Sequence, residues 1–112
     1  MNIQNFITEW IAASNAFHTE KYLDFYLPNA ILDDPSVGMK FNGRQGIKKY
    51  FDNYFIGYNT HTEQVNIIIN DQQNIHLEVI FTGDFPEGKV GGTFDFNFRN
   101  GKIAFAKANL IH

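Results

Sequence analysis

The sequence predicts one α+β domain in which helices form the first half and an antiparallel sheet forms the second. Apolar residues recur with the spacing of a helix face up to about residue 56, and they alternate with polar residues from about residue 65 onward. Short turn sequences separate the alternating segments, which is typical of an antiparallel meander. A chain of 112 residues is expected to form one core, so we expect a single domain, residues 1–112.

Three helices are predicted. The second is short, residues 19–26, because Thr19 and Glu20 suit a helix start and Pro28 prevents its continuation. The first covers about residues 3–18, with an apolar face formed by Ile3, Phe6, Ile7, Trp10, Ile11, Ser14 and Phe17. The third covers about residues 43–56, with an apolar side formed by Ile47, Tyr50, Phe51, Tyr54 and Phe55.

A short apolar strand, Ala30–Leu32, leads directly into Asp33 and Asp34 and is stopped by Pro35. A carboxylate at the end of a buried strand, among aromatic residues, can act as a general base, and Asp34 is our candidate. The alternative is a turn residue that accepts backbone N–H bonds in the Pro35–Ser36 turn. Asp33 points to the other side of a strand, where we expect solvent.

The second half is predicted to contain strands near residues 65–69, 75–82 and 93–98, and a last strand from Lys102 to about Ile111. Turns are expected at residues 71–74 and 86–88, and Asn100-Gly101 is a strong hairpin signal. Gly91 and Gly92 are expected to mark a β-bulge that bends the sheet.

One face of these strands is apolar, and the helices must pack on it. Ile68 and Ile80 lie on the opposite face, which favours its partial burial against a partner, so we expect a homodimer through this outer face. The polar residues expected on the same face are His76, Glu78, Asp95, Asn97 and Lys107.

Composition excludes several function classes. The net charge is −3 and Lys48-Lys49 is the only adjacent basic pair, so a nucleic-acid partner is not expected. No apolar run approaches the length of about 18 residues that a membrane span needs, and no signal peptide is visible. The absence of cysteine excludes disulfides and thiolate chemistry and favours the cytoplasm. The histidines are scattered without a standard metal-ligand spacing. His76 and Glu78 share a strand face and could chelate a metal, but a surface or dimer-interface pair is the preferred interpretation, so no metal is expected. No cofactor is expected either.

Aromatic residues make up 16% of the chain, which suits the lining of an apolar cavity as well as a core. For each single residue, ordinary core packing is the alternative to a place in the pocket wall. Trp10 is a candidate hydrogen-bond donor to a ligand. The candidate ligand-binding residues are Tyr26, Tyr50, Phe51, Tyr54, Phe81, Phe94 and Phe96.

The order of these elements resembles the nuclear-transport-factor-2-like (cystatin-like) superfamily, which includes ketosteroid isomerase and the SnoaL-like polyketide cyclases. The resemblance implies a cone-shaped fold, in which a curved antiparallel sheet wraps around the N-terminal helices and leaves a gap between sheet and helices. It covers essentially the whole chain. The segments that carry it are 10–13, 25–30, Asp33-Asp34-Pro35, Gly43 with Gly46-Ile47 and Tyr50-Phe51, then Gly83, Gly92 and 96–103.

In the isomerase branch, the resemblance implies a general-base Asp in the acid–Pro motif, which matches Asp34. It also implies a Tyr donor on the first helix, and Trp10 stands near that position with an indole N–H instead. The leading hypothesis is therefore a pocket beside Asp34 for a small apolar or cyclic molecule, with cofactor-free proton transfer of the isomerase or cyclase type. The alternatives are a non-catalytic carrier or sensor with the same pocket, and a protein-interaction module whose aromatic residues fill the cone.

Overall fold

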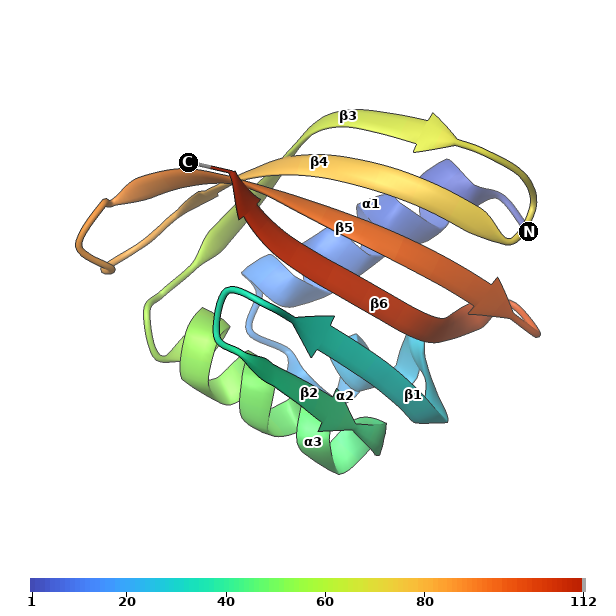
Figure 1. Ribbon diagram of the computed structural model, residues 1–112, viewed down its shortest axis with the longest axis horizontal. Helices are drawn as coiled ribbons and strands as arrows, with labels where there is room; N and C mark the ends of the chain where they lie inside the picture. Colours follow the sequence, from blue (N-terminus) through green and yellow to red (C-terminus); the bar gives the residue numbers. More distant parts are fainter. Residues whose placement is uncertain (112) are drawn as a thin grey trace.

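The structure, a computed structural model, describes residues 1–111, and it places a curved six-stranded sheet over three N-terminal helical segments (Figure 1). The α+β prediction is confirmed. The elements are α1 (Ile3–Asn15), α2 (Thr19–Asp24), β1 (Tyr26–Asp34), β2 (Met39–Asn42), α3 (Gly43–Phe51), the π-helical turn η1 (Asp52–Ile56), β3 (His61–Ile69), β4 (Asn74–Thr82), β5 (Lys89–Arg99) and β6 (Lys102–Ile111).

The strand order is β2-β1-β6-β5-β4-β3. The meander from β3 to β6 is antiparallel, as the sequence predicts, and β2 adds an antiparallel edge strand to β1. The pairing of β1 with β6 is parallel, with Leu32 opposite Ala106 and Asp33 opposite Lys107. This pairing places the end of β1, and with it Asp34, beside the C-terminal strand.

The first two helices end earlier than the sequence predicts. At the end of α1, Phe17 takes a left-handed conformation with a φ of 54°, which stops the helix. The Asn15 side chain then joins this end to the sheet, because it donates to the carbonyl of Thr62 (3.0 Å) and accepts from the amide of Thr62 (2.8 Å). After α2, the Ile103 amide donates to the Phe25 carbonyl and thereby starts the pairing of β1 with β6.

The third predicted helix is divided into α3 and the π-helical turn η1. A π-turn inserts an extra residue into a helix and is frequent at functional sites. The Thr60 hydroxyl donates to the Tyr54 carbonyl (2.8 Å), so a carbonyl of the turn is satisfied from outside the helix. The turn buries Phe55 against the sheet and leaves Tyr54 half-buried beside it.

The prediction of a β-bulge at Gly91 and Gly92 is wrong, because the pairing register between β4 and β5 is regular at these two residues. The register shifts on β5 instead between Asn97 and Phe98, opposite β6. Gly92 is needed for a different reason, because the ring of Phe81 lies so close that a Cβ on Gly92 would be 2.3 Å from it. The glycine therefore makes room for an aromatic ring.

The outer sheet face carries a row of cross-strand neighbours, Ile68, His76, Asp95 and Lys107. The Nδ1 atom of His76 lies 2.7 Å from Asp95 Oδ1, and its other nitrogen lies 4.0 Å from Glu78. The two acids thus lie against opposite nitrogens of one imidazole ring on this face. Ile68 is 48% exposed on this face.

None of the helices within residues 1–111 has both the length and the apolar character needed to cross a membrane.

Candidate functional site

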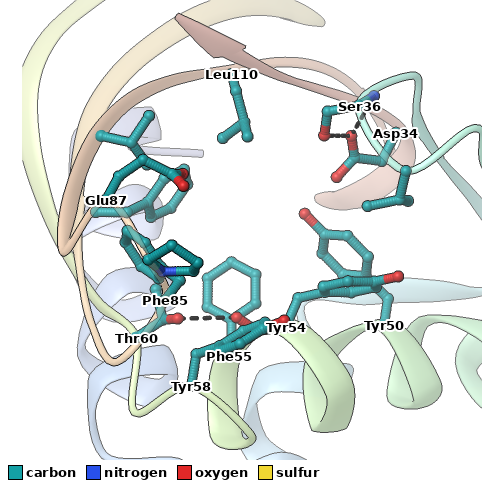
Figure 2. Close-up of a pocket in the computed structure, with 14 residues that line it drawn as sticks. Asp34, Ser36, Tyr50, Tyr54, Phe55, Tyr58, Thr60, Phe85, Glu87 and Leu110 are labelled. Carbon is teal, nitrogen blue, oxygen red and sulfur yellow. Dashed lines mark hydrogen bonds between the residues drawn. The ribbon is translucent and has the colours of Figure 1, made fainter. Parts of the chain in front are cut away.

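A pocket of about 230 Å³ opens between the helical layer and one end of the sheet (Figure 2). Its walls come from the end of β1 and the turn after it, from α3 and η1, from the segment before β3, and from the β4–β5 turn. The lining residues are Asp34, Ser36, Val37, Tyr50, Tyr54, Phe55, Tyr58, Thr60, Phe81, Phe85, Pro86, Glu87, Val90 and Leu110.

Asp34 is the last residue of β1 and is only 6% exposed. Its Oδ1 atom accepts hydrogen bonds from the Ser36 amide (3.0 Å) and from the Ser36 hydroxyl. Both bonds therefore fix one oxygen, while the carboxylate as a whole is directed toward the pocket (Figure 2). The ion pairs within residues 1–111 involve Asp52, Glu78 and Asp95 but not Asp34, so this buried carboxylate has no cationic partner there.

Tyr50 lies beside Asp34 on the same side of the pocket (Figure 2). Burial raises the pKa of the Tyr50 phenol well above its usual value of 10.0, and the negative charge of Asp34 raises it further. The Tyr50 hydroxyl therefore keeps its proton at any physiological pH. It is a permanent hydrogen-bond donor next to a carboxylate.

The floor of the pocket is aromatic. Tyr54 packs on Tyr50 with ring centroids 5.5 Å apart, and Phe55 meets Phe81 edge to face at 5.8 Å. Phe81 is the residue for which Gly92 makes room, so the position of this wall depends on the glycine.

The far wall is a fixed aromatic corner. Tyr58 and Phe85 meet edge to face with ring centroids 6.1 Å apart. The β4–β5 turn is bound to the segment before β3 twice, because the Asp84 amide donates to the Tyr58 carbonyl (2.7 Å) and the Asn59 side chain donates to the Asp84 carboxylate (2.7 Å). Glu87, from the same turn, lies opposite Asp34 across the pocket (Figure 2).

Of the candidate residues from the sequence, Asp34, Tyr50, Tyr54 and Phe81 line the pocket. The others lie in the core: Trp10, Tyr26, Phe51, Phe94 and Phe96 are at most 2% exposed and are not part of the lining. These residues were expected in the pocket because sequence spacing shows which face of a helix or strand is apolar. The spacing does not show whether a residue on that face borders a cavity or packs against other side chains.

Trp10 in particular does not face a ligand, because its indole N–H donates to the Tyr26 hydroxyl (3.2 Å), and Tyr26 and Tyr22 share a hydrogen bond of 2.8 Å. Burial raises the pKa of Tyr26 to about 12 and raises that of Tyr22 well above 10.0. These three residues form a closed polar network inside the core, which satisfies the buried N–H and hydroxyl groups.

Several lining residues were not singled out from the sequence, among them Ser36, Tyr58, Thr60, Phe85 and Glu87. All of them lie in connecting segments. Ser36 lies between β1 and β2, and the meeting of Tyr58 and Thr60 with Phe85 and Glu87 depends on the hydrogen bonds between the β4–β5 turn and the segment before β3. Ser36 was detectable, because a Ser two residues after an Asp is a common partner in an Asp-initiated turn.

Residues 7–106 match the SnoaL-like domain family. The chain belongs to this family. No curated protein matches the chain.

Solved structures with the same fold are numerous, and three illustrate their range. A nuclear-transport-factor-2-like protein of unknown function from Burkholderia xenovorans is 19% identical, with a TM-score of 0.82 over 96% of this chain and 81% of that one. A Catenulispora acidiphila protein with a ketosteroid isomerase-like fold, in complex with trimethylamine, is 15% identical, with a TM-score of 0.81 over 92% and 82%. A Mycobacterium tuberculosis protein in complex with estradiol-17β-hemisuccinate is 14% identical, with a TM-score of 0.80 over 94% and 90%.

At these identities the likeness establishes the fold alone. The family match confirms the SnoaL-like assignment made from the sequence, and the solved structures confirm the predicted ketosteroid isomerase-like and nuclear-transport-factor-2-like fold.

Proposed function

We propose that this SnoaL-like protein binds a small organic molecule in the pocket beside Asp34 and moves a proton on it, with Asp34 as the general base. The observation that carries the proposal is the buried Asp34 carboxylate, which lies at the pocket wall next to the Tyr50 hydroxyl. Small-molecule ligands in two similar structures, trimethylamine in one and estradiol-17β-hemisuccinate in the other, support a binding role for the fold.

The chemistry follows from the two groups. Asp34 accepts a proton from a carbon next to a carbonyl, so a C–H bond breaks, an O–H bond forms on the carboxyl group, and the electron pair moves to the carbonyl oxygen. The Tyr50 hydroxyl donates a hydrogen bond to that oxygen and stabilises the enolate. Return of the proton to a different carbon is an isomerisation. In a ring closure, the enolate carbon attacks a second carbonyl of the same molecule, so a C–C bond forms, the C=O π bond of that carbonyl breaks, and its oxygen takes the proton from Asp34.

The role of Ser36 is to position the base. Its amide and hydroxyl hold one oxygen of Asp34, so the carboxylate keeps one orientation while the substrate binds. Pre-orientation of this kind lowers the entropy that is lost on reaching the transition state.

A suitable probe is 3-cyclohexenone, a small cyclic ketone whose isomerisation to the conjugated enone is followed by its ultraviolet absorbance. We expect the wild-type protein to accelerate this reaction, and Asp34→Asn to lose the acceleration while the affinity for the unreactive saturated ketone, cyclohexanone, changes little. Tyr50→Phe is expected to lower turnover by about 10²-fold, the usual effect of losing one oxyanion donor. Equal rates in wild-type protein and Asp34→Asn would refute the role of Asp34 as base.

A non-catalytic carrier or sensor is the second candidate, and the two hydrogen bonds from Ser36 to Asp34 favour it, because they are also those of an ordinary turn residue. Saturable binding of cyclohexanone without any turnover of 3-cyclohexenone would support the carrier. A complete lack of small-molecule binding would support the third reading, a protein-interaction module.

We also propose that two copies associate through the outer sheet face. Exposed apolar residues there, Ile68 on β3 and Phe105 on β6, support the proposal. Light scattering should give twice the chain mass of 12.9 kDa for the wild-type protein and a lower mass for Ile68→Lys. A monomeric wild-type protein at high micromolar concentration would contradict it.

The lack of cysteine continues to favour the cytoplasm, which cell fractionation tests.

A further inference from the structure

The ionisable lining of the pocket has one sign of charge. Asp34 and Glu87 are both acidic, and within residues 1–111 no Lys, Arg or His belongs to the lining. Lys89, the basic residue that follows Glu87 in the sequence, starts β5 outside the pocket wall. Neither acid takes part in an ion pair in the described part of the chain.

The two acids differ in what surrounds them. Asp34 is 6% exposed, and its Ser36 partners are neutral donors that bring no compensating positive charge. A buried carboxylate is costly unless a cation pairs with it, because the interior screens charge poorly. Glu87 lies at the exposed rim on the opposite side, so it extends the negative field to the entrance (Figure 2).

Between the acids the surface is aromatic. Tyr58 and Phe85 form the fixed corner next to Glu87, and Tyr50 and Tyr54 lie nearer to Asp34. The face of an aromatic ring attracts an ammonium group within about 6 Å, and the attraction grows as water is excluded. A wall of aromatic rings bordered by carboxylates is therefore suited to bind an organic cation.

The volume limits the ligand. A space of about 230 Å³ is below the range of about 300–1,000 Å³ that is usual for drug-sized ligands. The volume therefore favours a compact molecule.

We propose that the pocket is selective for a small organic cation, a molecule with an ammonium or methylated ammonium group held between Asp34 and Glu87 against the rings of Tyr58 and Phe85. This deepens the proposed function, since it rests on the pocket being a small-molecule site and names the class of molecule.

The test compares choline with its uncharged carbon analogue, 3,3-dimethylbutan-1-ol, by NMR titration of the intact protein. The two probes have nearly the same shape, so a difference in affinity reports the charge. We expect choline to bind at least fivefold more tightly at low salt, and we expect only the choline affinity to fall as salt is added.

Variants then assign the effect to the pocket. Glu87→Gln should weaken choline binding by about two- to fivefold, the range for an exposed charge pair, and leave the alcohol unaffected. Phe85→Leu keeps an apolar wall but removes a ring, and it should weaken choline selectively. Glu63→Gln is the matched control, because Glu63 is an exposed glutamate on β3 outside the lining.

The outcomes separate this inference from the proposed function. Equal affinity for choline and the alcohol, with no effect of Glu87→Gln, would overturn cation selectivity and leave the small-molecule pocket intact. Loss of choline binding in Glu63→Gln to the same extent as in Glu87→Gln would also overturn it, because the effect would then be one of net charge. If neither probe binds and cyclohexanone also fails to bind, both the inference and the pocket's binding role are refuted.

Discussion

Substitution of Gly92 by Ala should push the Phe81 ring into the pocket. A Cβ at this position would lie 2.3 Å from Phe81 Cε2, 3.1 Å from Cδ2 and 3.2 Å from Cζ. Non-bonded carbons prefer about 3.5–4.0 Å, so the ring must move by more than about 1 Å. Phe81 is held from the other sides by Phe55 and Phe94, with ring centroids at 5.8 and 5.9 Å, so the ring has little free space within the core.

The expected magnitude follows from two opposing terms. Overpacking a core usually costs about 1–3 kcal/mol. Replacing glycine by alanine also stabilises the folded protein by about 0.4–1 kcal/mol, because alanine lowers the conformational entropy of the unfolded chain. We therefore expect Gly92→Ala to lower the free energy of unfolding by about 1–2 kcal/mol, which corresponds to a fall in Tm of about 5–15 °C for a chain of this size.

Urea denaturation monitored by circular dichroism measures this change, and cyclohexanone titration monitors the pocket. Gly91→Ala is the matched control, because a Cβ there would meet only Ile111 at an ordinary 3.4 Å, so its stability should stay level or rise slightly. In the double variant with Phe81→Leu, the shorter side chain should recover part of the loss. A Gly92→Ala protein as stable as Gly91→Ala, with unchanged binding, would refute this account of Gly92.

Three further predictions concern the buried polar groups. Tyr26→Phe removes the acceptor of the Trp10 N–H and should lower the free energy of unfolding by about 1–3 kcal/mol in urea denaturation, whereas Tyr58→Phe at a half-exposed site should change it by less than about 0.5 kcal/mol. Asn15→Ala leaves the Thr62 amide and carbonyl without their side-chain partner and should cost about 1–3 kcal/mol by the same assay; a value near zero would show that water replaces the bridge. Alkaline pH should unfold the protein, because the folded pKa of Tyr26 is about 12 against an unfolded value of about 10: this stabilisation, about 2–3 kcal/mol, is complete below pH 10 and is lost as the pH rises toward 12. The phenolate absorbance of the buried tyrosines should therefore appear together with the loss of the circular dichroism signal, and ionisation of all the tyrosines without unfolding would contradict the burial of Tyr26.

Much of the fold was predictable because hydrophobic periodicity records which face of each element is buried. The spacing of Ile3, Ile7 and Trp10 predicted α1, and the alternation from Ile75 to Phe81 predicted β4 and its inward face. The parallel pairing of β1 with β6 was not predictable in the same way, because nothing local in Leu32 or Ala106 specifies its partner. The π-helical turn likewise depends on Thr60, which lies beyond the helix and acts through a hydrogen bond.

The site was predictable only in part. Asp34 was identified because an acid that ends an apolar strand is a visible local pattern. Trp10 and Tyr26 were misplaced, because an aromatic residue on an apolar face looks the same in sequence whether it contacts a ligand or another side chain. Glu87 was missed, because its place opposite Asp34 depends on how two turns meet in three dimensions.

The parallel pairing of β1 with β6 has a consequence for how the chain is made. During synthesis β1 leaves the ribosome early, yet one of its edges stays unpaired until β6, the last strand, has been added. The wall that carries Asp34 is therefore assembled last, and a nascent chain that stalls before β6 presents an open strand edge beside an apolar surface, which invites aggregation. Contacts between such distant segments also slow folding, so the emergence of β6 is expected to set when the pocket can first form.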